Sequence, residues 1–166
     1  MTNLRGAHHV GLHVQSIERS RSFFEEFLEC TVIFEWNPQA PYIGVLTGHP
    51  NVDLRGCILR LPSTDVALEL LEYQNVDLEP ADPASAAPGT AHLAFFVNDV
   101  DALYANWTAR GVLSVSEPVT PTIGPNEGGR VVYMLDPDGN RIELIQSRGT
   151  FTDFAARQQK TPEGCC

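Results

Sequence analysis

His9-Val-Gly-Leu-His-Val-Gln-Ser-Ile17 and His92-Leu-Ala-Phe-Phe-Val-Asn-Asp-Val100 are two copies of one pattern, and this repeat predicts the fold. Each copy runs histidine, apolar, small, apolar, any residue, valine, two polar residues, apolar. Each is typical of a strand that leads into a helix N-cap, which is Ser16 in the first copy and Asp99 in the second. The repeat therefore indicates two tandem structural modules.

The segments that follow each copy also correspond. Helical spacing of apolar residues follows both copies, at Phe23, Phe24, Phe27 and Leu28, and at Val100, Leu103, Tyr104 and Trp107. Three short strands are then expected in each module, over 31–36, 56–61 and 66–73, and over 113–116, 129–135 and 141–146. Asp136-Pro-Asp-Gly-Asn140 predicts the hairpin turn before the last strand. The sequence thus predicts an α+β fold of two tandem βαβββ modules that form a curved, barrel-like mixed sheet around a metal cavity.

This pattern predicts one domain over residues 1–147. Its parts are expected as module one at 7–75, a linker at 76–89, module two at 90–147, and a polar C-terminal tail at 148–166. An apolar insertion at 37–54 interrupts the first module, with one helical turn expected near Tyr42–Leu46. We interpret this insertion as a flap over the cavity that brings Tyr42 or Trp36 to a substrate.

Composition narrows the choice of partners. The 166 residues carry a net charge of −10, with 11 basic and 21 acidic residues, which argues against a nucleic acid partner. The sequence has no apolar run of membrane-spanning length and no secretion signal, so we expect a cytoplasmic protein without a membrane partner. A small, weakly polar molecule fits best, and an anionic one fits if arginines line the pocket. Cys30 and Cys57 are expected to be buried structural thiols, whereas Cys165-Cys166 closes the tail.

Strand alternation brings four polar side chains to the cavity. If Val10, Leu12 and Val14 pack on the first helix, His9 faces the opposite side, and His92 does the same in the second module. Glu69 and Glu143 lie between leucine or isoleucine neighbours, where burial is costly unless something neutralises the carboxylate. Alone, each of these residues has an ordinary structural role. Their equivalence in the repeat favours one divalent ion (Zn, Ni, Co, Mn or Fe) bound by His9, Glu69, His92 and Glu143.

The same faces carry further candidates. His13, Tyr73 and Phe96 share these faces and are expected to contact substrate, together with Tyr42 from the insertion. We also expect a homodimer, since sheets of this kind leave edges and apolar faces that pair between chains.

Four phrases give the chain a family resemblance. They are His8-His-Val-Gly-Leu12, Ala67-Leu-Glu-Leu-Leu71, Ala91-His-Leu-Ala94 and Asp136-Pro-Asp-Gly-Asn-Arg-Ile-Glu-Leu144. Through them, residues 7–147 resemble the vicinal oxygen chelate superfamily, which includes glyoxalase I, methylmalonyl-CoA epimerase, fosfomycin-resistance proteins and extradiol dioxygenases. The resemblance implies a metal bound by the first and last strands of each module, at the same four residues.

The resemblance leaves several activities open. A glyoxalase- or epimerase-like isomerase or lyase would stabilise an enolate or oxyanion, with Glu143 or Glu69 as the base. Epimerase-like members use a further carboxylate on a third strand, and the nearest position here is Leu59. An extradiol-type Fe(II) dioxygenase would use His9, His92 and Glu143, which leaves Glu69 as a surplus charge. A non-catalytic small-molecule binding or resistance protein would generally lack the metal ligands.

Overall fold

The computed structural model describes residues 3–77, 88–147 and 149. It divides into two compact units, Met1–Asp82 and Pro83–Cys166, which are described separately below. Most of the predicted linker and nearly all of the predicted tail, with Cys165 and Cys166, lie outside the described residues. The strands of the two units form two small sheets, which confirms the mixed α+β class. That the sheets form one barrel-like layer around a cavity stays a prediction.

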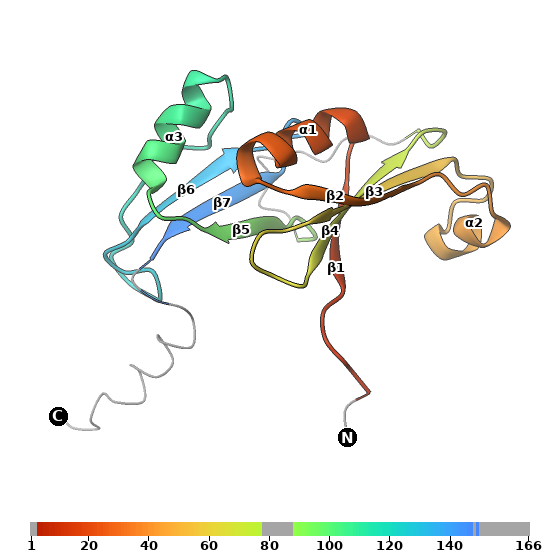
Figure 1. The fold of residues 1–166 in the computed structure, drawn as a ribbon, viewed down its shortest axis with the longest axis horizontal. Coiled ribbons are helices and arrows are strands. Elements are labelled where there is room, and N and C mark those ends of the chain that lie inside the picture. The colour runs from red at the N-terminus through yellow and green to blue at the C-terminus, as the bar shows by residue number, and fades with distance from the viewer. Residues whose placement is uncertain (1–2, 78–87, 148, 150–166) are drawn as a thin grey trace. The chain divides into compact units, whose positions relative to one another are not determined.

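The described residues of the first unit form four strands and two helices (Figure 1). Its elements are β1 (His9–His13), α1 (Ile17–Leu28), β2 (Thr31–Trp36), α2 (Pro41–Thr47), β3 (Leu54–Arg60) and β4 (Ala67–Tyr73). The sheet has the strand order β1-β4-β3-β2. Its first and last strands, β1 and β4, pair in parallel, while the other pairs are antiparallel. This pairing brings the two ends of the unit's sequence side by side.

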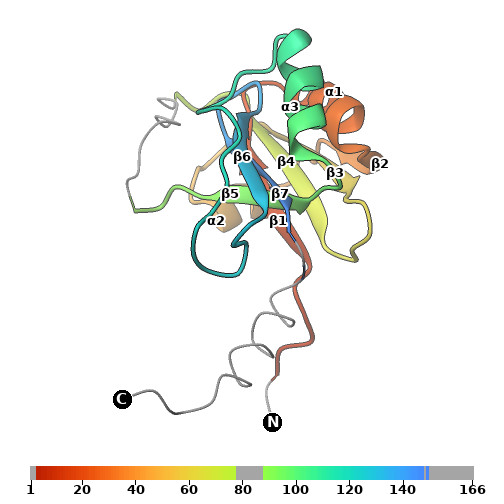
Figure 2. The ribbon, with the colours of Figure 1, turned by 90° about the vertical axis from the view of Figure 1, so that its left-hand side faces the viewer.

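The second unit repeats the outline with one strand fewer. Its elements are β5 (His92–Phe96), α3 (Val100–Ala109), β6 (Arg130–Leu135) and β7 (Arg141–Gln146). The strand order is β5-β7-β6, and β5 and β7 again pair in parallel. Figure 2 shows α3 beside the strands of its own unit, where it packs on β6 and β7. No described helix is long and apolar enough to cross a membrane.

The predicted helix starts are confirmed in both units. The Ser16 side chain accepts from the backbone N–H of Arg19 at 3.3 Å, and the Asp99 carboxylate accepts from that of Ala102 at 2.9 Å. Each N-cap satisfies one of the backbone donors that a helix leaves unpaired in its first turn. Gly111 follows α3 with a φ of 85°, the left-handed conformation that glycine adopts at low cost.

A second helix contact, which the sequence pattern did not predict, ties each helix to the last strand of its unit. Glu72 Oε2 accepts from the N–H of Ile17 at 2.9 Å, and Gln146 Oε1 accepts from the N–H of Val100 at 3.0 Å. These acceptors lie three residues beyond Glu69 and Glu143. The repeat therefore extends to the hydrogen bonds that hold each helix to its sheet.

Apolar side chains on one face of each sheet form the cores. In the first unit, α1 packs on β3 and β4, where Cys57, Leu59, Leu68 and Leu70 are fully buried. Burial raises the pKa of the Cys30 and Cys57 thiols to about 11, which supports their reading as structural thiols. Since strand residues alternate between faces, Ile58, Arg60, Glu69 and Tyr73 lie on the face opposite α1.

Two expectations about the strands were wrong. Only an isolated bridge between Ser114 and Met134 forms where a strand over 113–116 was expected, and a second isolated bridge joins Val119 to Val131, so this segment follows the edge of β6 without a continuous ladder. Val10 was expected to pack on the first helix, but it is exposed. It lies near the start of the edge strand β1, and α1 packs on β3 and β4.

The insertion is a compact structure. It contains α2, which is longer than the single turn expected, and its Ile43 is buried. Gly44 packs against the backbone of His49 and Asn51 so closely that a side chain would need them to shift. Asn75, just past β4, accepts from the N–H of Asp53 and donates to the carbonyl of Asn51. These contacts hold the insertion to the end of β4.

Trp36, at the entry to the insertion, lies directly over Gly56. A Cβ on Gly56 would overlap the indole ring, whereas a Cβ on Gly11 would meet only Leu71 at an ordinary 3.8 Å. Strand residues opposite each other share a face, so Trp36 and Gly56 lie on the face opposite α1. Glycine at position 56 therefore makes room for the indole.

We predict that Gly56→Ala destabilises the protein by about 1–3 kcal/mol, because the new methyl group forces the Trp36 indole out of its position. Urea unfolding followed by circular dichroism measures this change. Gly11→Ala is the matched control and should shift the midpoint far less. Equal midpoints for the two variants would contradict the close packing of Trp36 on Gly56.

Candidate functional site

His9 and Glu69 lie in contact on the face of the first sheet opposite α1. Parallel pairing of β1 and β4 sets Gly11 opposite Glu69, and His9 reaches the glutamate from two residues before. The distance from His9 Nε2 to Glu69 Oε2 is 3.2 Å, and the side chains are 40% and 17% exposed. The carboxylate is thus largely withdrawn from water, while one edge of the imidazole stays open.

His92 and Glu143 form the equivalent pair in the second unit. Parallel pairing of β5 and β7 sets Ala94 opposite Glu143, which is the register of the first unit. The distance from His92 Nε2 to Glu143 Oε2 is 3.1 Å, and the side chains are 45% and 16% exposed. Each unit therefore offers one imidazole nitrogen and one carboxylate oxygen, with nearly the same geometry.

His8 is a residue that the strand pattern left aside. Its Nδ1 lies 2.7 Å from Nδ1 of His9, so one of the two rings donates a hydrogen bond to the other. A histidine that binds metal through Nε2 is commonly oriented by a partner at Nδ1. His8 is placed to orient His9 in this way.

Tyr133 is the most informative residue that sequence reasoning missed. It lies directly opposite Glu143 on β6, and its ring meets His92 edge-on at 5.3 Å between centroids. The Arg141 guanidinium lies 5.6 Å from the same ring. Burial raises the pKa of Tyr133, and the negative charge of the nearby Glu143 carboxylate raises it further. Counting back from the predicted turn at Asp136–Asn140 would have revealed the pairing.

In the described part of the first unit, β3 places no such group opposite Glu69. The residue opposite Glu69 on β3 is Ile58, whereas Leu59 is fully buried and lies on the face toward α1. Leu59 was therefore the wrong position for a third-strand base, although Ile58 supplies no carboxylate either. The two histidine–glutamate pairs differ in their surroundings, since one is next to a phenol and the other next to an aliphatic side chain.

The predicted substrate-contacting residues are only partly brought together. His13 and Tyr73 lie on the same face as His9 and Glu69, with ring centroids 5.1 Å apart, and His49 from the insertion meets Tyr73 at 5.8 Å. Tyr42 lies on α2 and is exposed. Phe96, in the second unit, is also exposed at the end of β5.

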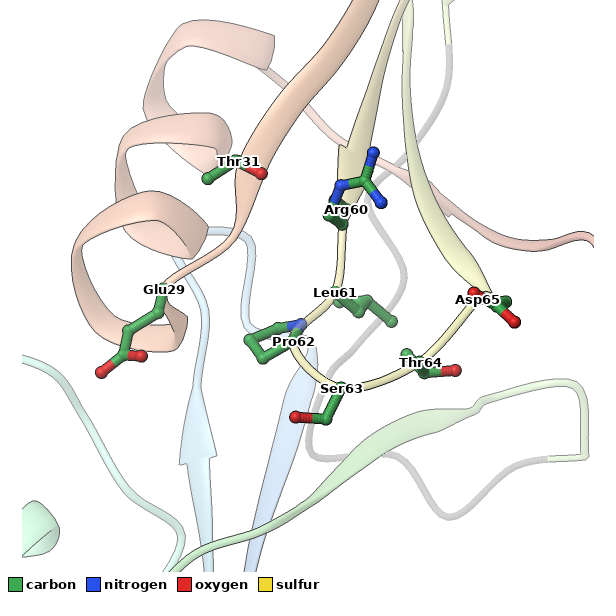
Figure 3. Close-up of a pocket in the computed structure, with 8 residues that line it drawn as sticks. All are labelled: Glu29, Thr31, Arg60, Leu61, Pro62, Ser63, Thr64 and Asp65. Atoms are coloured by element: carbon green, nitrogen blue, oxygen red, sulfur yellow. The ribbon is translucent and has the colours of Figure 1, made fainter.

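An open pocket of about 510 Å³ lies at the end of the first sheet where β3 turns into β4 (Figure 3). It contains none of the predicted metal ligands. Its lining residues are Glu29, Thr31, Arg60, Leu61, Pro62, Ser63, Thr64 and Asp65. Thr31 and Arg60 lie opposite each other on β2 and β3.

The donors of the two pairs are of the types that bind Zn, Fe, Ni, Co or Mn. A catalytic metal site usually needs three protein ligands, and each pair supplies two. Within the described residues, no cluster of three or more histidine, cysteine, aspartate or glutamate side chains could hold a metal ion. The donor atoms are of the types that bind a metal, but both pairs would be required to supply enough ligands.

The comparisons with known proteins agree on one protein family. The profile of the Glyoxalase/Bleomycin resistance protein/Dioxygenase superfamily matches residues 6–144. A curated relative, a 2-epi-5-epi-valiolone epimerase from Actinomyces sp, is 35% identical over 144 residues, which cover 83% of this chain and 77% of that protein.

Solved structures share the fold. A glyoxalase family protein from Bacillus cereus matches with a TM-score of 0.76 and 24% identity, over 89% of this chain and 97% of that one. The trypanothione-dependent glyoxalase I of Leishmania major matches with a TM-score of 0.68 and 23% identity, over 95% and 96% of the two chains. At these identities the likeness is one of fold.

We predict that Tyr133 titrates above the ordinary range of tyrosine in the metal-free protein, and that Glu143→Gln lowers its pKa. The variant removes the negative charge that opposes a phenolate, while burial continues to raise the pKa. Carbon NMR of labelled tyrosine rings follows the titration, with Tyr133→Phe identifying the signal. Glu69→Gln is the control and should leave the Tyr133 titration unchanged. An unaltered titration in Glu143→Gln would contradict the contact.

Proposed function

The chain belongs to the glyoxalase/bleomycin resistance protein/dioxygenase superfamily, and from this membership we propose that it is a metal-dependent isomerase of epimerase type. The observation that supports the proposal is the pair of equivalent histidine–glutamate contacts, His9–Glu69 and His92–Glu143. The epimerase relative, at 35% identity, favours inversion of a stereocentre over the other chemistries of the superfamily. The substrate is a small hydroxylated carbonyl compound.

The four side chains together would hold one divalent metal ion. Such an ion, when bound, draws electrons from a substrate carbonyl oxygen and so acidifies the adjacent C–H group. His9 and His92 present neutral nitrogen donors, and His8 fixes the ring of His9. Glu69 and Glu143 compensate the charge of the ion, which offsets the cost of holding two carboxylates largely out of water.

The glutamates also move the proton. One carboxylate removes the proton next to the carbonyl, and the electron pair of that C–H bond moves onto the carbonyl oxygen to give an enolate. Inversion requires a proton from the other face of the planar enolate, so a second group must return it. We assign the two roles to Glu69 and Glu143, which exchange them when the reaction runs backwards.

The surroundings of the glutamates make their roles unequal. Tyr133 lies opposite Glu143 and stays protonated, because its pKa is raised. Its phenol can therefore donate a hydrogen bond to Glu143 and hold that carboxylate in place. Glu69 has Ile58 opposite and no such partner on β3, so its carboxylate is the freer of the two.

Two other activities would each be identified by a different experimental result. An Fe(II) dioxygenase would need only His9, His92 and Glu143, but Glu69 lies against His9, where it would crowd an open coordination position. Oxygen uptake by iron-loaded protein that survives Glu69→Ala would select the dioxygenase. Protein that binds a ligand but takes up no metal would select a non-catalytic binding protein.

We predict that the Glu69→Gln and Glu143→Gln variants each lose inversion by about a hundredfold or more, the usual contribution of a positioned acid or base. The assay incubates 2-epi-5-epi-valiolone, and then other hydroxy ketones, in D₂O, and follows inversion and deuterium incorporation separately. In this two-base scheme, a variant that keeps one of the two glutamates still incorporates deuterium into one epimer but does not invert it.

Elemental analysis of both variants controls for metal loss, since glutamine keeps an oxygen donor at each position. His49→Ala is the matched histidine control and should retain its metal. Wild-type protein that takes up metal but neither inverts nor exchanges any of these compounds would refute the epimerase assignment for this class of substrate. Full inversion by both glutamine variants would refute the roles of the glutamates.

We also predict a homodimer, with twice the 18.2 kDa mass of one chain by light scattering. The edge strand β2 exposes Ile33 and Phe34, an apolar surface that pairing between chains would cover. A monomer at micromolar concentration would contradict this.

An experiment on mixed dimers tests whether the metal site lies within one chain or is shared between two. Mixing His9→Ala with His92→Ala subunits would restore about a quarter of the activity if one pair comes from each chain, because about half of the dimers are mixed and each mixed dimer carries one intact site of two. It would restore none if both pairs come from one chain.

A further inference from the structure

Within the described part of this acidic chain, the Arg60 side chain has no ion-pair or hydrogen-bond partner. The chain carries 21 acidic and 11 basic residues, so an arginine readily finds a carboxylate. In the first unit, Arg21 pairs with Glu25 and Glu35, and Arg55 pairs with Glu18 and Glu72. Among the described residues, no side chain forms an ion pair or hydrogen bond with Arg60.

The strand register places Arg60 on the face that carries His9 and Glu69. His9 lies opposite Ala67 on β4, and Ala67 lies opposite Arg60 on β3. With strands about 4.8 Å apart, the Cα atoms of His9 and Arg60 are about 10 Å apart. Glu69 is a diagonal neighbour of Arg60, about 7–8 Å away and within reach of a long side chain.

Ala67 lies between His9 and Arg60 in this row across the sheet. It contributes only a methyl group between His9 and Arg60, where a larger side chain would fill the gap. The equivalent position in the second unit is Arg141, whose guanidinium lies near the Tyr133 ring. The two units therefore differ at this position, where the first has a small side chain and the second has a large one.

The pocket of Figure 3 adjoins this row. Thr31 lies directly opposite Arg60, so its hydroxyl and the guanidinium point from the same face. Glu29 and Asp65 also line the pocket, but Figure 3 shows the Arg60 guanidinium turned away from both carboxylates. Neither acid neutralises the arginine, and both lie farther along the turn side of the pocket.

We propose that Arg60, assisted by the Thr31 hydroxyl, binds an anionic group of the substrate, a phosphate or a carboxylate. The proposal rests on the proposed function, because the His9–Glu69 pair marks where the carbonyl reacts. The substrate is thus a small hydroxylated carbonyl compound with its anionic group at the far end of a short carbon skeleton. The skeleton is short because the Cα atoms of Arg60 and His9 are only about 10 Å apart.

The chemistry of the guanidinium suits this role. Its planar fork donates two parallel hydrogen bonds to a carboxylate or phosphate, and it stays charged at every physiological pH. It takes no part in proton transfer. Arg60 acts as a specificity residue, which holds the substrate by the end that does not react.

The test measures binding of simple anions by the metal-free, full-length protein. Nitrogen NMR records the Nε–H signals of the arginines while inorganic phosphate, acetate or sodium chloride is added, and Arg60→Met identifies the Arg60 signal. We expect this signal to move and saturate with phosphate or acetate, but not with chloride. Tighter phosphate binding indicates a phosphorylated substrate, and tighter acetate binding indicates a carboxylate.

Variants test whether anion binding depends on the guanidinium fork and the Thr31 hydroxyl or on positive charge alone. Arg60→Lys should weaken binding about tenfold, because lysine keeps the charge but loses the fork, and Thr31→Val should weaken it several-fold. Arg21→Met removes an arginine that is already ion-paired and should leave binding unchanged. An Arg60 signal that stays fixed, or moves equally with chloride, overturns the proposal. Metal uptake and deuterium exchange do not enter this result, so a failure of the epimerase assignment is seen separately.

Discussion

Parallel pairing between the first and last strands of each unit is the constraint on which the rest depends. The pairs β1–β4 and β5–β7 join residues that lie far apart in sequence. Backbone hydrogen bonds from Val14 to Leu71 and from Val97 to Ile145, both 2.9 Å, end the two pairs at the same place. Because side chains alternate along a strand, this one register decides that each histidine meets its glutamate. A slip by one residue would turn both glutamates toward the helices.

The helices reinforce this register. Glu72 and Gln146 accept from the first N–H groups of α1 and α3, so the last strand of each unit is held to its helix as well as to its first strand. Glu69 and Glu143 are thus anchored three residues before a fixed contact. Two carboxylates that are mostly withdrawn from water need compensation, and the adjacent imidazoles provide a weak form of it. A cation bound between donors of this kind would provide a stronger form.

The two units share the same strand register, but different residues surround their glutamates. Tyr133 and Arg141 surround Glu143 with polar groups, while Ile58 and Ala67 take the corresponding positions around Glu69. The glutamates occupy equivalent register positions in the two units, but their cross-strand neighbours differ, so the two carboxylates lie in unequal surroundings.

The sequence by itself determined the repeat, both helix starts, and the strands that carry the histidines and glutamates. These features depend on spacing along the chain, which the pattern of apolar and polar residues records directly. It did not determine Tyr133, Ile58, His8 or Arg60 as neighbours of those residues, and it misplaced a strand at 113–116 and the helix-facing role of Val10. Those features depend on which strands pair and in what register. Pairing is a contact between distant segments, and a local pattern fits several registers equally well. Only the tertiary structure selects one, because there the buried faces and the backbone hydrogen bonds must be satisfied together.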